Sequence, residues 1–430
     1  MTSGNAAWSG ARIAALVLAT VTSSACTGDA RPSTTAVVDS AGVRIVTNLP
    51  GSIESAVAWS LPAQPVVDIG SGVSPDVPLY RVTAVVPLDG SRVAVGMDTP
   101  PQALVFEPGG TLAATLGRQG EGPGEFATVT SVVQLAGDSL AVWDQNRRRV
   151  SVFMDGRYVR DVDLSALALL SPLAAGSLDT PSAWSQLLPS TAGSLVLLQV
   201  RIGGEPAPGA FRMEAPSYRL TTDGEEQARF GPFPGEELYN LGVGLGGIYS
   251  YPFGADTYGA TAADAFVVGT AETPEFRLYG HSGALERIVR WADQDRTVGG
   301  RLLAEWSEIR EAWFASMSAD QRVVIGDFLN RMPHPERFPA YDGIVTSDVG
   351  EIWIGEYAGP LEMPYPPLHV RAPVRRWLVF DIDGALVATV HTPEGFQPYA
   401  VREERIWGVY TDELDIESIR AYAITRACCS

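Results

Sequence analysis

Three features of the 430-residue sequence predict an all-β fold, a six-bladed β-propeller with a short helical insertion between blades 4 and 5. Short apolar segments rich in β-branched and aromatic residues recur along the chain, as expected of strands. Turn sequences of the Asp-Gly type separate these segments, in a chain with 44 glycines and 31 prolines. The pattern also repeats, because Phe106 and Phe153 occupy equivalent places 47 residues apart.

The repeating unit is clearest between Thr128 and Leu164. It divides into four short expected strands joined by tight turns, which is the content of one propeller blade. Five further units follow the same pattern, at 82–116, 194–230, 265–291, 343–390 and 399–424. The last unit lacks an outer strand. Residues 43–47 or 56–60 are expected to supply it and close the ring, which would leave no exposed sheet edge.

An export signal is predicted at the N-terminus. Residues 13–21 form an apolar run that is too short to span a bilayer but fits the core of a secretory signal peptide over 1–25. Ser24-Ala25-Cys26 resembles the end of a bacterial lipobox, so Cys26 is expected to carry a lipid. The same bond also suits an ordinary signal peptidase. Residues 26–42 are rich in small and polar residues and are expected to be a flexible tether to a propeller at 43–427.

Composition narrows the classes of partner. The net charge of −19 repels polyphosphate, so nucleic-acid binding is not expected. Cys428 and Cys429 lie at the C-terminus, and no cysteine lies in the middle of the chain, which excludes a disulfide scaffold. No later segment is apolar enough to span a membrane, so membrane contact is expected only through Cys26. The chain is therefore predicted to be exported, and to lie in the periplasm or on the outer surface.

The segment from Gly117 to Phe126, Gly-Arg-Gln-Gly-Glu-Gly-Pro-Gly-Glu-Phe, is distinctive. Together with 143–156 and 377–384 it resembles bacterial six-bladed propellers of the NHL-like and TolB-like group, which include predicted lipoproteins. The resemblance covers about 45–425 and implies the fold, whereas propellers carry unrelated activities. The glycines are interpreted as a tight crossover between blades. A phosphate-binding loop is not expected, because neither a helix nor a Lys-Ser or Lys-Thr pair follows.

Long insertions are expected to crowd one face of the propeller. Strand direction alternates within a blade, so the loop between the second and third strands lies on the same face as the connection to the next blade. The insertions fall in these two kinds of loop, at 203–215, 231–263, 292–340 and 355–373. Residues 296–331 are predicted to be helical, since apolar residues follow the helical period between Arg301 and Met317. Loops on a rigid scaffold are common places for binding residues.

The candidate ligand-binding residues lie on this insert-crowded face. They are Tyr341 and Asp342 at the start of an inner strand, Trp306 and Arg310 on the expected helix, and Tyr365, His369 and Arg371 in the 355–373 loop. No nucleophile elbow and no zinc-protease motif is present. The sequence therefore favours an envelope-associated module that binds an unidentified protein or small molecule. The alternative is a hydrolase or lyase with a site in the central channel, assisted by Ca²⁺ or Zn²⁺.

Overall fold

The computed structural model describes residues 34–426 with interruptions. Left out of the description are 1–33, 71–76, 168–184, 191–192, 201–205, 243–247, 316, 320–321, 324–325, 327–332, 360–361, 365–366, 370–373 and 427–430. The predicted signal peptide, Cys26, Cys428 and Cys429 lie outside the described residues. None of the described helices is long and apolar enough to cross a bilayer.

Six sheets of four or more strands make up most of the described residues. In chain order, the first sheet consists of β5 (Val82–Pro87), β6 (Val93–Asp98), β7 (Pro101–Phe106) and β8 (Leu112–Leu116). The second consists of β11 (Ser131–Gln134), β12 (Ser139–Asp144), β13 (Arg149–Met154) and β14 (Arg157–Asp163). The third consists of β15 (Ser185–Ser190), β16 (Ser194–Gln199), β17 (Gly209–Thr221), β18 (Glu226–Asn240) and β19 (Ile248–Ser250).

The fourth sheet contains β20 (Tyr258–Ala262), β21 (Ala265–Gly269), β22 (Glu275–Tyr279) and β23 (Leu285–Arg290). The fifth contains β24 (Tyr341–Thr346), β25 (Ile352–Glu356), β28 (Arg375–Phe380) and β29 (Leu386–Thr392). The sixth contains β30 (Phe396–Arg402), β31 (Arg405–Thr411) and β32 (Glu417–Ala423). Within each sheet, neighbouring strands of these sets are antiparallel, as tight turns require.

The first strands of the six sheets form a ring. β5 contacts β11, and the contacts continue through β15, β20, β24 and β30, which contacts β5 again. The sheets therefore surround a central channel, and the chain is a β-propeller, as its sequence predicted.

The N-terminal strands add to three successive sheets. β1 (Thr35–Ser40) pairs with β2 (Val43–Asn48), which runs parallel to β23. β3 (Val57–Ala58) runs parallel to β29, and β4 (Val67–Ile69) pairs with β32 of the last sheet. Between β2 and β3 lies the short helix α1 (Ser52–Ser55).

This arrangement corrects two sequence-based expectations. The outer strand of the last sheet is β4, and neither 43–47 nor 56–60 supplies it. β2 pairs with β23 and β3 with β29, and Ser60 forms only an isolated bridge with Thr425, beyond the end of β32. Residues 35–40, expected in the tether, form β1. Thr35–Ser40 and the turn at Ala41-Gly42 make a hairpin with β2, and Gly42 has the positive φ of 84° that such a turn favours.

The hydrophobic core lies between successive sheets. Middle strands face a neighbouring sheet on each side, so their side chains are buried on both faces, and all six residues of β12 are buried. Trp143 in β12 is fully buried, and its Nε1 donates a hydrogen bond to Ser185 Oγ of the next sheet at 2.9 Å. Such bonds fix the angle between sheets while apolar packing stabilises them.

The Gly117–Phe126 segment forms the crossover that its sequence predicted. β9 (Arg118–Gln119) and β10 (Glu125–Phe126) pair in parallel, and Glu125 Oε2 accepts a hydrogen bond from Gly122 N at 2.8 Å. Arg149 of β13 donates to the carbonyl oxygens of Gly122 at 3.1 Å and Glu125 at 2.5 Å. The backbone of this segment is therefore held by its own chain.

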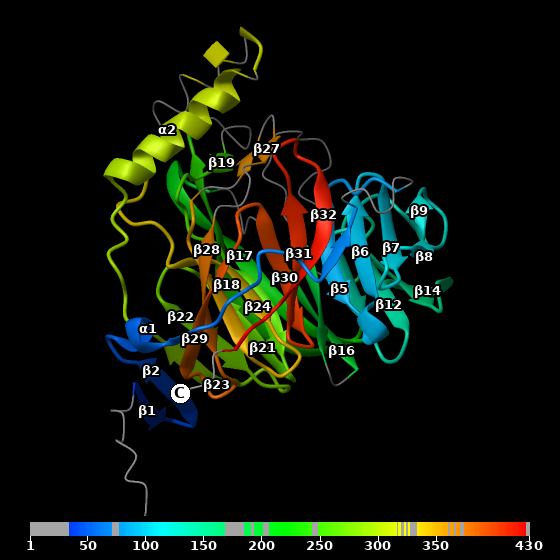
Figure 1. Cartoon of the computed structure of the whole chain (residues 1–430), viewed down its shortest axis with the longest axis horizontal. Coiled ribbons are helices and arrows are strands. Elements are labelled where there is room, and N and C mark those ends of the chain that lie inside the picture. The colour runs from blue at the N-terminus through cyan, green and yellow to red at the C-terminus, as the bar shows by residue number, and fades with distance from the viewer. Residues whose placement is uncertain are drawn as a thin grey trace, which may run out of the picture. The chain divides into compact units, whose positions relative to one another are not determined.

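The insertions gather at one end of the propeller. The helix α2 (Gly300–Ala315) lies between β23 and β24, within the predicted helical insertion at 296–331. A hairpin of β26 (Glu362–Pro364) and β27 (Pro367–His369) lies between β25 and β28. Figure 1 shows α2, β19 and β27 at the same end, which we call the insert end. Much of the second expected helix lies outside the described residues.

Candidate functional site: the channel and its insert-end mouth

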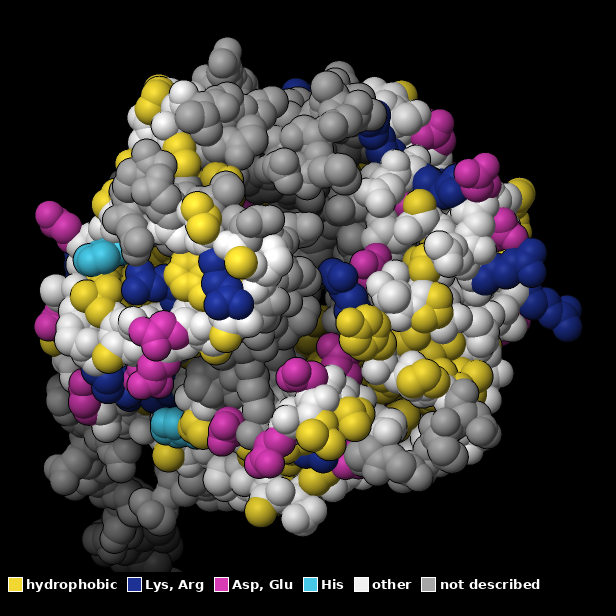
Figure 2. Space-filling model, turned by 90° about the horizontal axis from the view of Figure 1, so that it is seen from above, with side chains coloured by type: hydrophobic (Ala, Val, Ile, Leu, Met, Phe, Trp, Pro, Cys, Tyr) yellow, Lys and Arg dark blue, Asp and Glu magenta, His cyan; other side chains and the backbone are white. Residues whose placement is uncertain are grey.

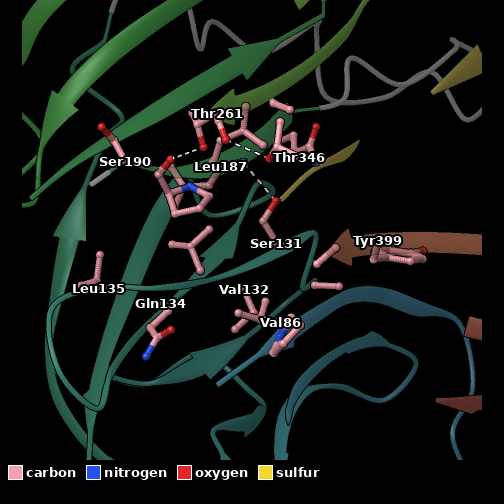
Figure 3. A pocket seen from close by; sticks show the side chains of 18 of the residues that line it. Val86, Ser131, Val132, Gln134, Leu135, Leu187, Ser190, Thr261, Thr346 and Tyr399 are labelled. Atoms are coloured by element: carbon pink, nitrogen blue, oxygen red, sulfur yellow. Dashed lines mark hydrogen bonds between the residues drawn. The ribbon is translucent and has the colours of Figure 1, made fainter. Parts of the chain in front are cut away.

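The channel holds a cavity of about 980 Å³ that is lined by all six inner strands. Its volume lies within the range of small-molecule sites, about 300–1,000 Å³. Hydroxyl groups tie neighbouring inner strands together along its wall (Figure 3): Leu187 N donates to Ser131 Oγ at 3.0 Å, and Thr346 Oγ1 donates to Thr261 O at 2.8 Å. These bonds hold the inner strands together. The wall between them consists of small polar and apolar side chains.

The charged residues that line this cavity lie at its end away from the insert end. Within the described part of its lining, the charged residues are Arg160, Asp348, Arg402 and Glu403. Asp348 and Glu403 lie in the turns after the inner strands, and Arg402 donates to Pro87 O at 2.8 Å and Gln134 Oε1 at 3.0 Å. Arg402 is thus engaged in joining strands. The body of the channel carries no charge among these residues.

The opposite end of the channel, at the insert end, is charged. β20 begins with Tyr258 and β24 with Tyr341-Asp342, directly before the cavity-lining residues of the same strands. Figure 2 looks onto this end and shows the surface hollowed near its centre, with side chains of both charges beside the hollow. Two of the sequence-predicted ligand-binding residues, Tyr341 and Asp342, therefore lie near the channel mouth.

Tyr341 belongs to the core. It is fully buried, its ring packs against Trp291 and Tyr258, and its hydroxyl donates to Glu275 O at 2.8 Å. Burial raises the pKa of this phenol well above its ordinary value. Tyr341, one of the candidate ligand-binding residues, is therefore not accessible to a ligand, because the side chain of the first residue of β24 packs in the core.

Asp342 is paired with a buried arginine. Its Oδ2 accepts a hydrogen bond from Ala358 N at 3.1 Å, and its Oδ1 lies 3.1 Å from Nη1 of Arg375. Only 9% of the Asp342 side chain and 3% of the Arg375 side chain are exposed. Burial raises the pKa of Asp342 to about 6, although Arg375 opposes the rise.

The pair is incompletely hydrogen-bonded. Nη1 and Nη2 of Arg375 and Oδ1 of Asp342 are buried, and they have no hydrogen-bond partner within the described part of the chain. Nη1 and Oδ1 are 3.1 Å apart, so the two charges attract each other, but the angles at the two atoms do not suit a hydrogen bond. Buried polar groups in this condition are uncommon and call for an explanation.

Two glycines bring Arg375 to the channel side of its sheet. Arg375 begins β28, the third strand from the channel, and its side chain crosses Gly355 of β25 toward Gly343 of β24. A Cβ at Gly355 would lie 3.1 Å from Arg375 Cδ and 3.1 Å from the Trp377 ring. The guanidinium also lies 5.7 Å from the centroid of the Trp377 ring, which stabilises the cation.

A second carboxyl group lies at the same mouth. Burial raises the pKa of Asp256 to about 8, and Glu236 adds to the rise. The hydrogen bond from Thr257 N at 2.6 Å and the charge of Arg212 oppose it. Burial also raises the pKa of Tyr258, followed by the charges of Asp256 and Asp342, so both carboxyl groups lie near this phenol.

Aromatic rings flank the carboxyl groups. Tyr357 and Phe338 stack with their centroids 5.5 Å apart and their planes 23° apart. Both residues are partly exposed. Burial and then the Asp342 charge raise the pKa of Tyr357, which places its phenol near that carboxylate. The mouth thus combines two acids, an arginine and flat apolar surface.

The remaining predicted residues are placed only in part. Trp306 of α2 makes an edge contact with Phe253, with centroids 5.9 Å apart, so the helix packs on the insertion before β20. Nε of Arg310 is buried with no hydrogen-bond partner within the described residues. His369 ends β27. Tyr365 and Arg371 lie outside the described residues. A ligand-binding role for Trp306, Arg310, Tyr365, His369 and Arg371 stays a prediction.

No metal site is evident among the described residues, since no group of three or more His, Cys, Asp or Glu side chains could hold an ion there. The described residues therefore offer no set of three such side chains to the predicted Ca²⁺ or Zn²⁺, and we derive no chemistry through either ion.

No protein-family model and no curated protein matches the sequence. Several solved structures are similar to it at low TM-scores. A member of the DUF4221 family from Bacteroides vulgatus has a TM-score of 0.48 at 10% identity, over 86% of this chain and 99% of the other. A calcium-binding protein, regucalcin, from Agrobacterium tumefaciens has a TM-score of 0.42 at 10% identity, over 86% and 97%.

Virginiamycin B lyase from Staphylococcus aureus has a TM-score of 0.38 at 9% identity, over 80% of this chain and 97% of the other. Likeness at this level extends no activity to the present chain.

Proposed function

We propose that this propeller is an exported binding protein that takes up a small polar ligand at the insert-end mouth of its channel. The observation that carries the proposal is the buried Asp342–Arg375 pair, whose facing polar atoms lack hydrogen-bond partners within the described part of the chain. A ligand that supplies those bonds would bind selectively, because buried unpaired polar groups are costly. The cavity of about 980 Å³ lies further along the channel, where its lining on β24 begins at Ile344.

The cellular setting belongs to the same proposal. The apolar run at 13–21 and Ser24-Ala25-Cys26 support export and a lipid anchor at Cys26. Such an anchor would hold the binding protein at a periplasmic or outer membrane surface. A protein ligand on the insert-bearing face is a further candidate, which the helix α2 favours because it projects at that end (Figure 1).

A second candidate function is catalysis, as a hydrolase or lyase. It is favoured by the two carboxyl groups of Asp256 and Asp342, whose pKa values of about 8 and about 6 differ and lie near neutrality. Acids with separated pKa values near the working pH are suited to proton transfer. This candidate uses the same site and would also require a bound ligand.

Binding can be tested on the mature chain with a panel of small sugars, amino acids, carboxylic acids and nucleosides, by ligand-observed NMR. Arg375→Met removes the unpaired donors, whereas Arg376→Met removes a cation on the opposite face of β28, where Arg376 pairs with Glu356 at 2.7 Å. We expect ligands that bind the native chain and Arg376→Met but not Arg375→Met. Binding that is equal in all three, or absent from the native chain, would overturn the proposal.

A further inference from the structure

The atoms without hydrogen-bond partners at the insert-end mouth include both donors and an acceptor. Nη1 and Nη2 of Arg375 are donors, and Oδ1 of Asp342 is an acceptor, with 3.1 Å between Nη1 and Oδ1. These atoms are buried, so a ligand bonds to them only when the groups that cover them move aside, and it must then accept from the arginine and donate to the carboxylate. A hydroxyl group does both, whereas a carboxylate or phosphate of the ligand only accepts and an ammonium only donates.

Charge argues for a neutral ligand. An anion would meet the carboxylate of Asp342 as well as Arg375, and a cation would meet the buried guanidinium. Burial makes either like-charge approach costly, because the surrounding protein screens charge less than water does. A neutral polyhydroxylated ligand avoids both costs.

The flat rings beside the pair narrow the class further. Tyr357 immediately precedes Ala358, whose N–H binds Asp342, and Tyr357 stacks on Phe338. Both rings are partly exposed. A sugar ring presents hydroxyl groups at its edge and C–H groups on its face, so it can bond to the pair while it packs against an aromatic ring. The channel beyond is lined by hydroxyl side chains such as Ser131 and Thr346.

We infer that the insert-end mouth binds a neutral saccharide, with one ring hydroxyl bridging Arg375 Nη1 and Asp342 Oδ1 from the side and a sugar face on Tyr357. This inference rests on the proposed function and names its ligand class.

The test is saturation-transfer NMR of the mature chain with neutral sugars, glucose, galactose, N-acetylglucosamine and maltose, beside glucuronate, glucosamine and glutamate as charged probes. We expect transfer to at least one neutral sugar and weaker transfer to the charged probes. Arg375→Met should weaken sugar binding at least about tenfold, which corresponds to the loss of hydrogen bonds to a charged group. Arg376→Met should leave binding unchanged.

Tyr357→Leu provides a second variant that keeps the buried ion pair. We expect it to weaken sugar binding and to fold, as checked by its thermal midpoint, since Tyr357 is partly exposed. Binding of a charged probe in preference to sugars, lost in Arg375→Met, would overturn the saccharide inference and leave the proposed function standing. Binding of no probe, or sugar binding that both variants retain, would overturn the inference as well.

Discussion

Burial at the insert-end mouth changes the charge state of Asp256. Its pKa is raised to about 8 in the folded chain, and an unfolded aspartate titrates near 4. The folded chain therefore holds this proton more tightly than the unfolded chain. The resulting stabilisation is complete below the unfolded pKa and is lost as the pH rises through the folded pKa.

Asp256→Asn should remove this pH dependence, because asparagine stays neutral and its side-chain oxygen can still accept from Thr257 N. We expect the variant and the native chain to be similarly stable near pH 4, and the variant to be increasingly the more stable up to about pH 8. Thermal midpoints measured across this range check it. Asp39→Asn, at an exposed aspartate of β1, is the matched control. If the two variants give parallel curves, Asp256 is not held protonated.

Among the elements, the crossover that begins at Gly117 has a backbone conformation that requires glycine at this position. Gly117 has a φ of 69°, and a Cβ there would collide with the carbonyl oxygen of Gly124 and the ring of Phe126. Gly117→Ala is therefore expected to cost about 2–4 kcal/mol, from the left-handed conformation and the overpacking together. Gly109→Ala is the control, because nothing lies within 4 Å of a Cβ there. Equilibrium denaturation measures both, and an equal small effect would contradict the structural role of Gly117.

Elements with strong local patterns could be predicted from the sequence, and sites made by long-range convergence could not. Strands such as β12 and β13 combine β-branched residues with Asp-Gly or Gln-Asn turns, so their pattern is local. Asp342 was found because it starts an inner strand. Arg375 was missed, because its role depends on Gly343 and Gly355 in two other strands. Asp256 was missed because its raised pKa depends on burial in the folded chain and on the charge of Glu236, neither of which its local sequence indicates.

At the scale of the whole molecule, the ring is closed by residues from both ends of the chain. β4 pairs with β32 through Ile69 opposite Ile419 and Val67 opposite Ala421, and Arg420 binds Asp68 at 3.1 Å. β3 and β2 join the two preceding sheets. The N-terminal residues thus cover sheet edges that would otherwise be open to association with other chains. The local pattern did not reveal which strand closes the ring, because three apolar segments of similar character compete for that edge.

This closure predicts that a cavity in β4 loosens the last sheet. Ile69 is 1% exposed and packs in the core beneath β32, so Ile69→Ala should cost about 2–5 kcal/mol. Val38→Ala in β1 removes a side chain that is 59% exposed and should cost little. Hydrogen exchange should show faster exchange of β31 and β32 amides in Ile69→Ala than in the native chain or Val38→Ala, because opening β4 frees one edge of that sheet. If exchange increases only within β4, the last sheet is stable without its N-terminal strand, and closure contributes little to the stability of the ring.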